Sequence, residues 1–134
     1  MTKLKLDHLT IQCVNLDASR RFYVDVMGLC DGFRPPFDGP PGAWLYDDDG
    51  RPVVHLYAGR APDRIHDSAL DHAAFVVDDL PAFRSRLEAH GIAFGTSTVP
   101  GLAVTQLFFR DPDGVQIELS DASASAQIPR SVRS

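Results

Sequence analysis

The sequence predicts a single α+β domain that is built from two copies of a βαβββ module. Two observations support this prediction. Short landmarks recur in the same order about 64 residues apart, and each half runs from an alternating strand to a helix and then to three further strands. The chain has 134 residues, which is enough for one domain with a core of its own. We expect one domain over residues 1–120, with modules at about 4–58 and 69–120, and a flexible tail at 121–134.

The repeat is visible in motifs rather than in long stretches of identity. The tripeptide at residues 6–8 (LDH) recurs at residues 70–72 with an offset of 64 residues. At an offset of 63 residues, His55 falls on Glu118. The two LDH histidines therefore occupy equivalent places in the two modules, and so do His55 and Glu118.

The expected elements follow one plan in both modules. Asp17 has the chemistry of a helix N-cap, and Gly28 and Gly91 have that of left-handed helix ends. The first module is expected to contain a strand over 4–14, a helix over 17–28, and strands near 29–34, 43–47 and 53–58. The second is expected to contain a strand over 70–77, a helix from about 79 to 91, and strands near 92–96, 103–110 and 115–120.

The composition excludes several classes of partner and location. Thirteen Lys and Arg against eighteen Asp and Glu give a formal net charge of −5, which disfavours nucleic acid and anionic membranes as partners. No apolar run approaches the ~18 residues of a membrane span, and the first residues lack the apolar core of a signal peptide. Two cysteines do not make a disulfide framework. We therefore expect a cytoplasmic protein.

Alternation along the strands places the most reactive side chains on the side of the sheets away from the helices. In the first strand, Ile11 and Cys13 share the apolar face, which leaves Thr10 and Gln12 on the other. Imidazole and carboxylate groups that converge on such a face are donors for Zn, Fe, Ni, Co or Mn. The alternative is that an exposed sheet face simply carries polar residues. The four candidate ligands are His8, His55, His72 and Glu118.

A loop at residues 31–42 holds four prolines and three glycines, which excludes regular structure there. The loop is either a plain surface connection or the rim of a pocket that carries Phe33, Arg34 and Phe37. Five aromatic residues could line an apolar pocket for a drug-like ligand, although aromatic residues at strand spacing are more often part of a core. They are Phe33, Phe37, Trp44, Tyr57 and Phe108.

Four segments resemble the vicinal oxygen chelate superfamily, which includes glyoxalase I, extradiol dioxygenases, methylmalonyl-CoA epimerase, fosfomycin-resistance enzymes and bleomycin-binding proteins. The segments are residues 6–11 (LDHLTI), 19–29 (SRRFYVDVMGL), 70–75 (LDHAAF) and 111–119 (DPDGVQIEL). The resemblance implies a cup-shaped mixed sheet of eight strands around a divalent metal ion. It also implies a homodimer with sites at the interface between modules.

The resemblance assigns roles to individual residues. His8, His72 and Glu118 match the superfamily's two histidines and its carboxylate, and His55 stands at a fourth ligand position. Glu118 would act as the catalytic base, as a ligand able to shift away from the metal, and His55 would be either the fourth ligand or a second proton carrier. The substrate would be chelated through adjacent oxygens at a Zn, Ni, Co, Mn or Fe(II) ion. Its contacts are expected from Thr10, Gln12, Arg34, Phe37, Trp44 and Phe108.

Three functions are compatible with this ligand set. The leading one is a glyoxalase-like lyase or isomerase that stabilises an enolate for proton transfer. The first alternative is an Fe(II) ring-cleaving dioxygenase of the extradiol type, because two histidines and one carboxylate also form the facial triad of non-haem iron enzymes. The second alternative is a non-catalytic, bleomycin-type binding protein. Gln12 stands where bacterial glyoxalase I enzymes tend to carry an arginine that holds glutathione, which argues against a glutathione hemithioacetal as substrate.

Overall fold

The computed structural model describes residues 3–62, 69–98 and 105–121. Contacts divide the chain into two compact units, residues 1–67 and 68–134. The predicted connector at 59–68 spans the boundary between them, and its residues 63–68 lie outside the described part, as do tail residues 122–134.

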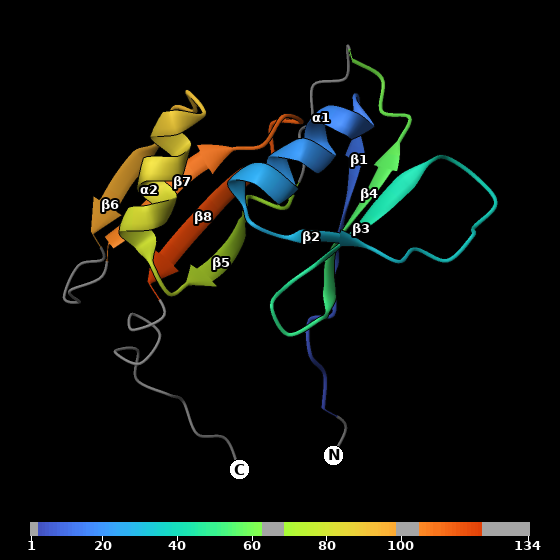
Figure 1. Cartoon of the computed structure of the whole chain (residues 1–134), viewed down its shortest axis with the longest axis horizontal. Helices are drawn as coiled ribbons and strands as arrows, with labels where there is room; N and C mark the ends of the chain where they lie inside the picture. The colour runs from blue at the N-terminus through green and yellow to red at the C-terminus, as the bar shows by residue number, and fades with distance from the viewer. Residues whose placement is uncertain (1–2, 63–68, 99–104, 122–134) are drawn as a thin grey trace. The chain divides into compact units, whose positions relative to one another are not determined.

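Unit 1 is a four-stranded mixed sheet with one helical segment (Figure 1). The strand order is β1-β4-β3-β2, in which β1 runs parallel to β4 and the other pairs are antiparallel. The elements are β1 (Leu9–Cys13), α1 (Leu16–Arg21), a π-helical turn η1 (Phe22–Val26), β2 (Cys30–Gly32), β3 (Gly42–Tyr46) and β4 (Pro52–Ala58).

Unit 2 repeats this topology. Its strand order is β5-β8-β7-β6, again with one parallel pair, β5 with β8. The match between the units confirms the predicted α+β fold with a duplicated βαβββ module. The elements are β5 (Ala73–Val77), α2 (Leu80–Ala89), β6 (Gly95–Thr98), β7 (Thr105–Arg110) and β8 (Gln116–Asp121).

The two helices begin at side-chain caps. The side chain of Asn15 accepts a hydrogen bond from the backbone N–H of Ala18, so Asn15 is the cap of α1 and the predicted start at Asp17 is two residues late. Asp79 caps α2 in the same way, as expected. Gly91, with φ of 67°, follows the end of α2 in the left-handed conformation that favours glycine.

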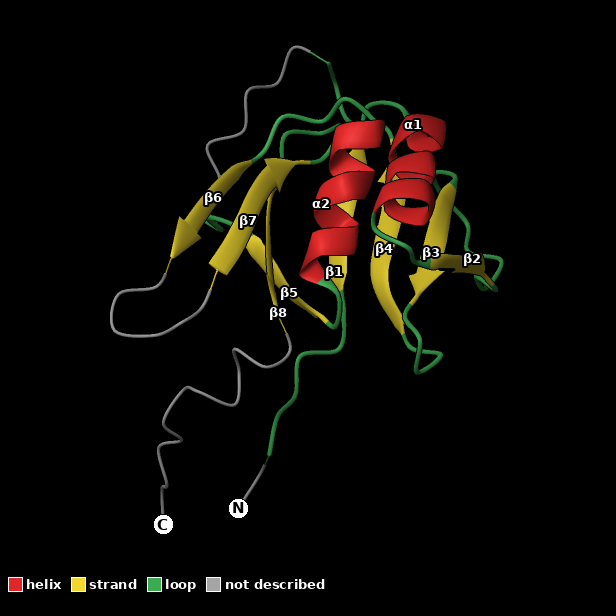
Figure 2. Cartoon of the chain, turned by 60° about the vertical axis from the view of Figure 1, so that its left-hand side comes forward, coloured by secondary structure: helices red, strands yellow, loops and turns green. Residues whose placement is uncertain are grey.

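Burial alternates along β1, β3, β5, β7 and β8, whereas three consecutive residues of β4, Val54, His55 and Leu56, are all buried. In unit 1 the buried face lies against α1, which contacts β4 (Figure 2), and in unit 2 it lies against α2, which contacts β8. Burial of these side chains is the main source of stability in each unit, because each removes apolar surface from water. The buried apolar strand residues are Ile11, Cys13, Ala43, Leu45, Val54 and Leu56 in unit 1, and Val77, Leu107, Phe109, Ile117 and Leu119 in unit 2.

The first strand of each unit is shorter than predicted. β1 begins at Leu9 and β5 at Ala73, not at residues 4 and 70, so His8 and His72 lie directly before their strands. In unit 1, Leu9 pairs with Val54, and β4 begins only two residues earlier, at Pro52, so β4 offers no partner for residues 4–6. Similarly, β6 begins three residues later than expected, at Gly95. Among the described residues, no helix has the length and apolar character needed to cross a membrane.

Candidate metal centre

The polar face of unit 1 centres on His55. Strand pairing places Thr10 of β1 and Trp44 of β3 on either side of His55, and residues that pair directly across strands project from the same face. The Trp44 and His55 rings are stacked with centroids 4.1 Å apart. The sequence-predicted residues Thr10, Trp44 and His55 therefore lie together on the face opposite α1.

His8 completes a stack of three rings. Its imidazole lies against the other face of His55, with centroids 3.8 Å apart and planes 11° apart. The Nδ1 atom of His8 lies 2.6 Å from a carboxylate oxygen of Asp7. A carboxylate only accepts hydrogen bonds, so Nδ1 carries the proton and Nε2 of the neutral ring holds the lone pair. This hydrogen bond from His8 also lowers the pKa of Asp7.

His55 presents the opposite nitrogen. It is only 6% exposed, between His8 and Trp44, and its Nε2 atom lies 3.0 Å from the carbonyl oxygen of Pro52. That carbonyl accepts, so Nε2 carries the proton and Nδ1 holds the lone pair. Burial and then repulsion from His8 lower the pKa of His55 below its ordinary 6.5. His55 is thus a neutral imidazole at neutral pH, which is the form that ligates metals.

The lowered pKa of His55 predicts acid sensitivity. The folded protein binds fewer protons than the unfolded chain below about pH 6.5, so the contribution of His55 to stability is full above that pH and falls as the pH drops toward its folded pKa. We expect the loss in melting temperature between about pH 7.5 and 5.5 to be smaller in His55→Gln than in the wild type. Thermal unfolding followed by circular dichroism measures it, with His90→Gln as the exposed control. An equal loss in the wild type and His55→Gln would contradict the prediction.

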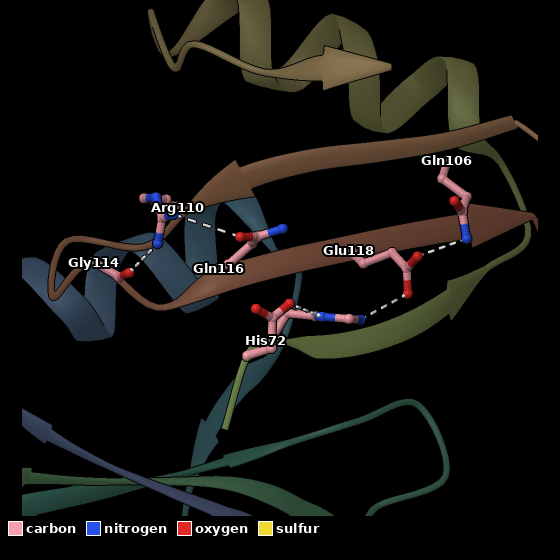
Figure 3. A network of polar contacts seen from close by, with 7 residues as sticks. His72, Gln106, Arg110, Gly114, Gln116 and Glu118 are labelled. Atoms are coloured by element: carbon pink, nitrogen blue, oxygen red, sulfur yellow. Dashed lines mark hydrogen bonds and ion pairs between the residues drawn. The ribbon is translucent and has the colours of Figure 1, made fainter. Parts of the chain in front are cut away.

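The polar face of unit 2 centres on Glu118. In β8, Glu118 pairs with Ala74 of β5 and Phe108 of β7, so Phe108 stands beside Glu118 as Trp44 stands beside His55. Figure 3 shows Glu118 between Gln106 and His72. The Gln106 amide donates to Oε1 of Glu118 at 2.6 Å, and Nε2 of His72 lies 3.5 Å from Oε2.

His72 repeats the arrangement of His8. Its Nδ1 atom lies 2.7 Å from a carboxylate oxygen of Asp71, so Nε2 is the nitrogen that faces Glu118. The hydrogen bond to Asp71 first, and the charge of Glu118 to a lesser degree, raise the pKa of His72. Nε2 of His72 and Oε2 of Glu118 face each other, and each is an atom type that would be able to ligate a divalent cation.

The structure brings the predicted ligands together in pairs. His8 meets His55 in unit 1, and His72 meets Glu118 in unit 2. Within the described residues, no three His, Cys, Asp or Glu side chains gather closely enough to hold a metal ion. The donor chemistry nevertheless fits a divalent metal, because each of the four side chains directs a lone pair away from its own hydrogen-bond partner.

Three further residues predicted from the sequence, Arg34, Phe37 and Gln12, also lie at the aromatic face of unit 1. Phe37 and Arg34 approach the aromatic face of unit 1, where the Phe37 and Trp44 centroids are 6.0 Å apart. Gln12 pairs with Tyr57 on the same face and is exposed. Gln106 was not predicted from the sequence, although its position two residues before Phe108 on one strand would have placed it on the Glu118 face.

Comparison with known proteins identifies the family. The model of the Glyoxalase/Bleomycin resistance protein/Dioxygenase superfamily matches residues 5–119, which is most of the chain. The chain belongs to this superfamily. This finding confirms the resemblance inferred from the motifs at residues 6–11 and 111–119.

Individual relatives are named for different reactions. "Glyoxylase I 4" of Arabidopsis thaliana is 30% identical over 132 residues, which cover 92% of this chain and 74% of the relative. "Biphenyl-2,3-diol 1,2-dioxygenase 3" of Rhodococcus globerulus is 30% identical over 122 residues, which cover 86% of this chain and 62% of the relative. The crystal structure of a glyoxylase/bleomycin resistance protein/dioxygenase domain from Frankia sp. EAN1pec has a TM-score of 0.76 at 25% identity, and covers 90% of this chain and 93% of its own. These similarities establish the superfamily, within which relatives are named for more than one kind of reaction.

Proposed function

We propose that this chain is a metal-dependent, glyoxalase-like lyase or isomerase that binds a small substrate through two adjacent oxygens and moves a proton on the neighbouring carbon. The observation that carries the proposal is the state of Glu118. One carboxylate oxygen is held by Gln106, and the other faces the imidazole of His72. Such a carboxylate is fixed in direction and still has a basic oxygen to offer.

The proposed ligands are the four side chains with lone pairs available. His8 and His72 would donate through Nε2, His55 through Nδ1 and Glu118 through Oε2, since the other atom of each group is engaged by a neighbour. Two stacked, nearly parallel rings cannot both hold one ion in their planes. We therefore expect His8, which lies on the exposed segment before β1, to turn when metal binds.

These contacts give each residue a separate role in the proposed reaction. When bound, a divalent metal supplies Lewis-acid stabilisation of negative charge that develops on the substrate oxygens. Glu118 would shift away from the metal and take the proton on Oε2, while the hydrogen bond from Gln106 to Oε1 keeps the carboxylate pointing toward the substrate. His55, neutral and buried, is the second group able to carry a proton.

The two aspartates that hold Nδ1 of His8 and His72 should support metal affinity. We expect Asp71→Ala to weaken metal binding by about 10–100-fold, which is the usual effect of removing an outer partner of a metal-binding histidine. Asp71→Asn should weaken it less, because an amide oxygen still accepts the hydrogen bond from Nδ1. Competition with a chromophoric chelator measures the affinity. Asp48→Asn, on an exposed turn, is the matched control, and an unchanged Kd in Asp71→Ala would contradict the prediction.

A second candidate is an Fe(II) dioxygenase that opens a catechol ring. The similarity to the Rhodococcus globerulus protein supports it, as does the set of His8, His72 and Glu118, which has the composition of a facial triad. Phe108 beside Glu118 provides an aromatic surface for a planar diol.

One experiment separates these functions. The protein is purified without chelators, its metal content is measured, and apoprotein is reconstituted anaerobically with Fe(II), Zn, Ni, Co or Mn. Each form is then offered hemithioacetals and catechols. Turnover without oxygen consumption supports the lyase or isomerase, and oxygen uptake with a catechol supports the dioxygenase. A protein that takes up no metal would be a small-molecule binder instead.

The assembly that we propose is a homodimer, as the superfamily resemblance implies. Each unit of one chain holds only two of the four proposed ligands, so dimer formation and metal uptake are best measured on the same sample. Light scattering coupled to size-exclusion chromatography gives the mass, and a monomer that binds metal stoichiometrically would overturn the dimer proposal.

A further inference from the structure

Arg34 lies in a cage of aromatic rings beside the metal-binding face of unit 1. Its guanidinium carbon is 5.3 Å from the centroid of the Phe37 ring and 5.7 Å from that of the Tyr57 ring. Tyr57 follows His55 by two positions on β4 and so projects from the same face of the sheet. The loop between β2 and β3, residues 33–41, thus brings a cation onto this face.

Gly42 makes room for this arginine. Gly42 pairs directly with Tyr57 and begins β3, two residues before Trp44. A Cβ atom at Gly42 would lie 2.9 Å from the guanidinium carbon and from Nε of Arg34, and 2.3 Å from the backbone oxygen of Leu56. Because Gly42 has no side chain, the guanidinium of Arg34 fills the space above it, beside Tyr57. The cross-strand pair of Gly42 and Tyr57 is next to the pair of Trp44 and His55 on the same face.

The hydrogen-bonding capacity of Arg34 is largely unused. Its Nε atom is buried without a hydrogen-bond partner, and Nη2 has only a long contact of 3.5 Å with the carbonyl oxygen of Pro40. Across residues 3–62, 69–98 and 105–121, no carboxylate forms an ion pair with Arg34. A half-buried guanidinium without a counter-charge is unfavourable unless a ligand supplies the acceptors.

We propose that Arg34 is the anion-binding residue of the substrate site, and that the substrates are small molecules with a carboxylate at one end and two adjacent oxygens at the other. Neighbouring same-face positions on a strand are roughly 6–7 Å apart, so the position of Tyr57, beside Arg34, is about that far along β4 from the position of His55. Phe37 and Tyr57 flank the guanidinium and its Nε is buried, so Nη1 and Nη2 are the groups left for a planar, two-point interaction with a carboxylate. This inference rests on the proposed function, because it names the chemical group at one end of a substrate whose other end is chelated by the metal.

Trp44 makes the proposal directly measurable. It is the single tryptophan of the chain, so tryptophan fluorescence reports on this face alone. The ring of Phe37 contacts both Trp44 and the guanidinium of Arg34, which links the fluorophore to the proposed anion site. The probes are succinate monohydroxamate, which carries a carboxylate and a metal-chelating hydroxamate, and its methylamide, which lacks the charge. We expect metal-loaded wild type to bind the carboxylate probe about 10–100-fold more tightly than the methylamide, as a charge-assisted pair of hydrogen bonds would give.

Substitutions test whether Arg34 causes the preference for the carboxylate probe. Arg34→Met keeps an apolar side chain between the rings and should bind both probes equally, with binding of the methylamide unchanged. Arg34→Lys should retain part of the preference. Arg21→Met, on the exposed side of α1, should behave as the wild type. A preference that is absent from the wild type, or that survives in Arg34→Met, overturns the proposal.

A metal-free arm separates this inference from the proposed function. If neither hydroxamate shows metal-dependent binding, the proposed function fails, and titration of the apoprotein with succinate decides about Arg34. Saturable quenching in the wild type that is lost in Arg34→Met supports the anion site on its own. No response to succinate in the wild type overturns it.

Discussion

Replacing Glu118 with glutamine is expected to lower kcat by about 10²–10⁴-fold, which is the usual loss when a general acid–base group is removed. A glutamine at this position can still accept the hydrogen bond from Gln106 through its amide oxygen. Its NH₂ group would then face His72, where the wild type has a basic oxygen. An amide cannot take a proton from carbon, so chemistry should fail while the local packing persists. Steady-state kinetics on metal-loaded protein, with the substrate found by the screen of hemithioacetals and catechols, measures the loss.

The control for this variant is Glu88→Gln on α2. Glu88 is an exposed carboxylate that pairs with Arg84 one helical turn away, and such pairs contribute at most about 0.5 kcal/mol. Its kinetics should match those of the wild type. If Glu118→Gln bound metal and kept the wild-type kcat, Glu118 would not be the base, and His55 would become the better candidate.

The strand period explains why the face of each candidate residue could be predicted. Side chains alternate with a period of two, so the burial of Val54 and Leu56 fixes His55 on the opposite side, and that of Ile117 and Leu119 fixes Glu118. The assignment survives small errors in strand ends. It holds even though β1 begins five residues later than predicted, because parity depends on spacing within the strand rather than on its length.

Contacts that depend on register or on loop conformation could not be predicted in this way. The stack of His8 on His55 depends on how β1 pairs with β4, and the hydrogen bond of Gln106 to Glu118 joins two strands. The position of Arg34 depends on a loop with four prolines, for which the sequence offers no period. The cap at Asn15 instead of Asp17 is a local competition between two residues of similar capping strength.

His72→Ala is expected to remove more metal affinity than any change around it. The variant loses the imidazole nitrogen that faces Glu118 and leaves Asp71 without its hydrogen-bond partner. Removal of an outer partner alone weakens metal binding by about 10–100-fold, so loss of a ligand should exceed 100-fold and leave the purified variant without stoichiometric metal. Elemental analysis gives the content, and chelator competition gives the affinity.

The fold should survive this substitution, which makes the result interpretable. His72 lies before β5 and is exposed, so its removal leaves no cavity among the buried residues of β7 and β8. Far-ultraviolet circular dichroism and the melting temperature should therefore stay close to those of the wild type. His90→Ala is the control, since the His90 ring bonds only to the carbonyl oxygen of Arg86 at the end of α2. Metal retained in His72→Ala at the wild-type level would remove His72 from the ligand set, and the metal would then have to be held without the imidazole that unit 2 offers beside Glu118.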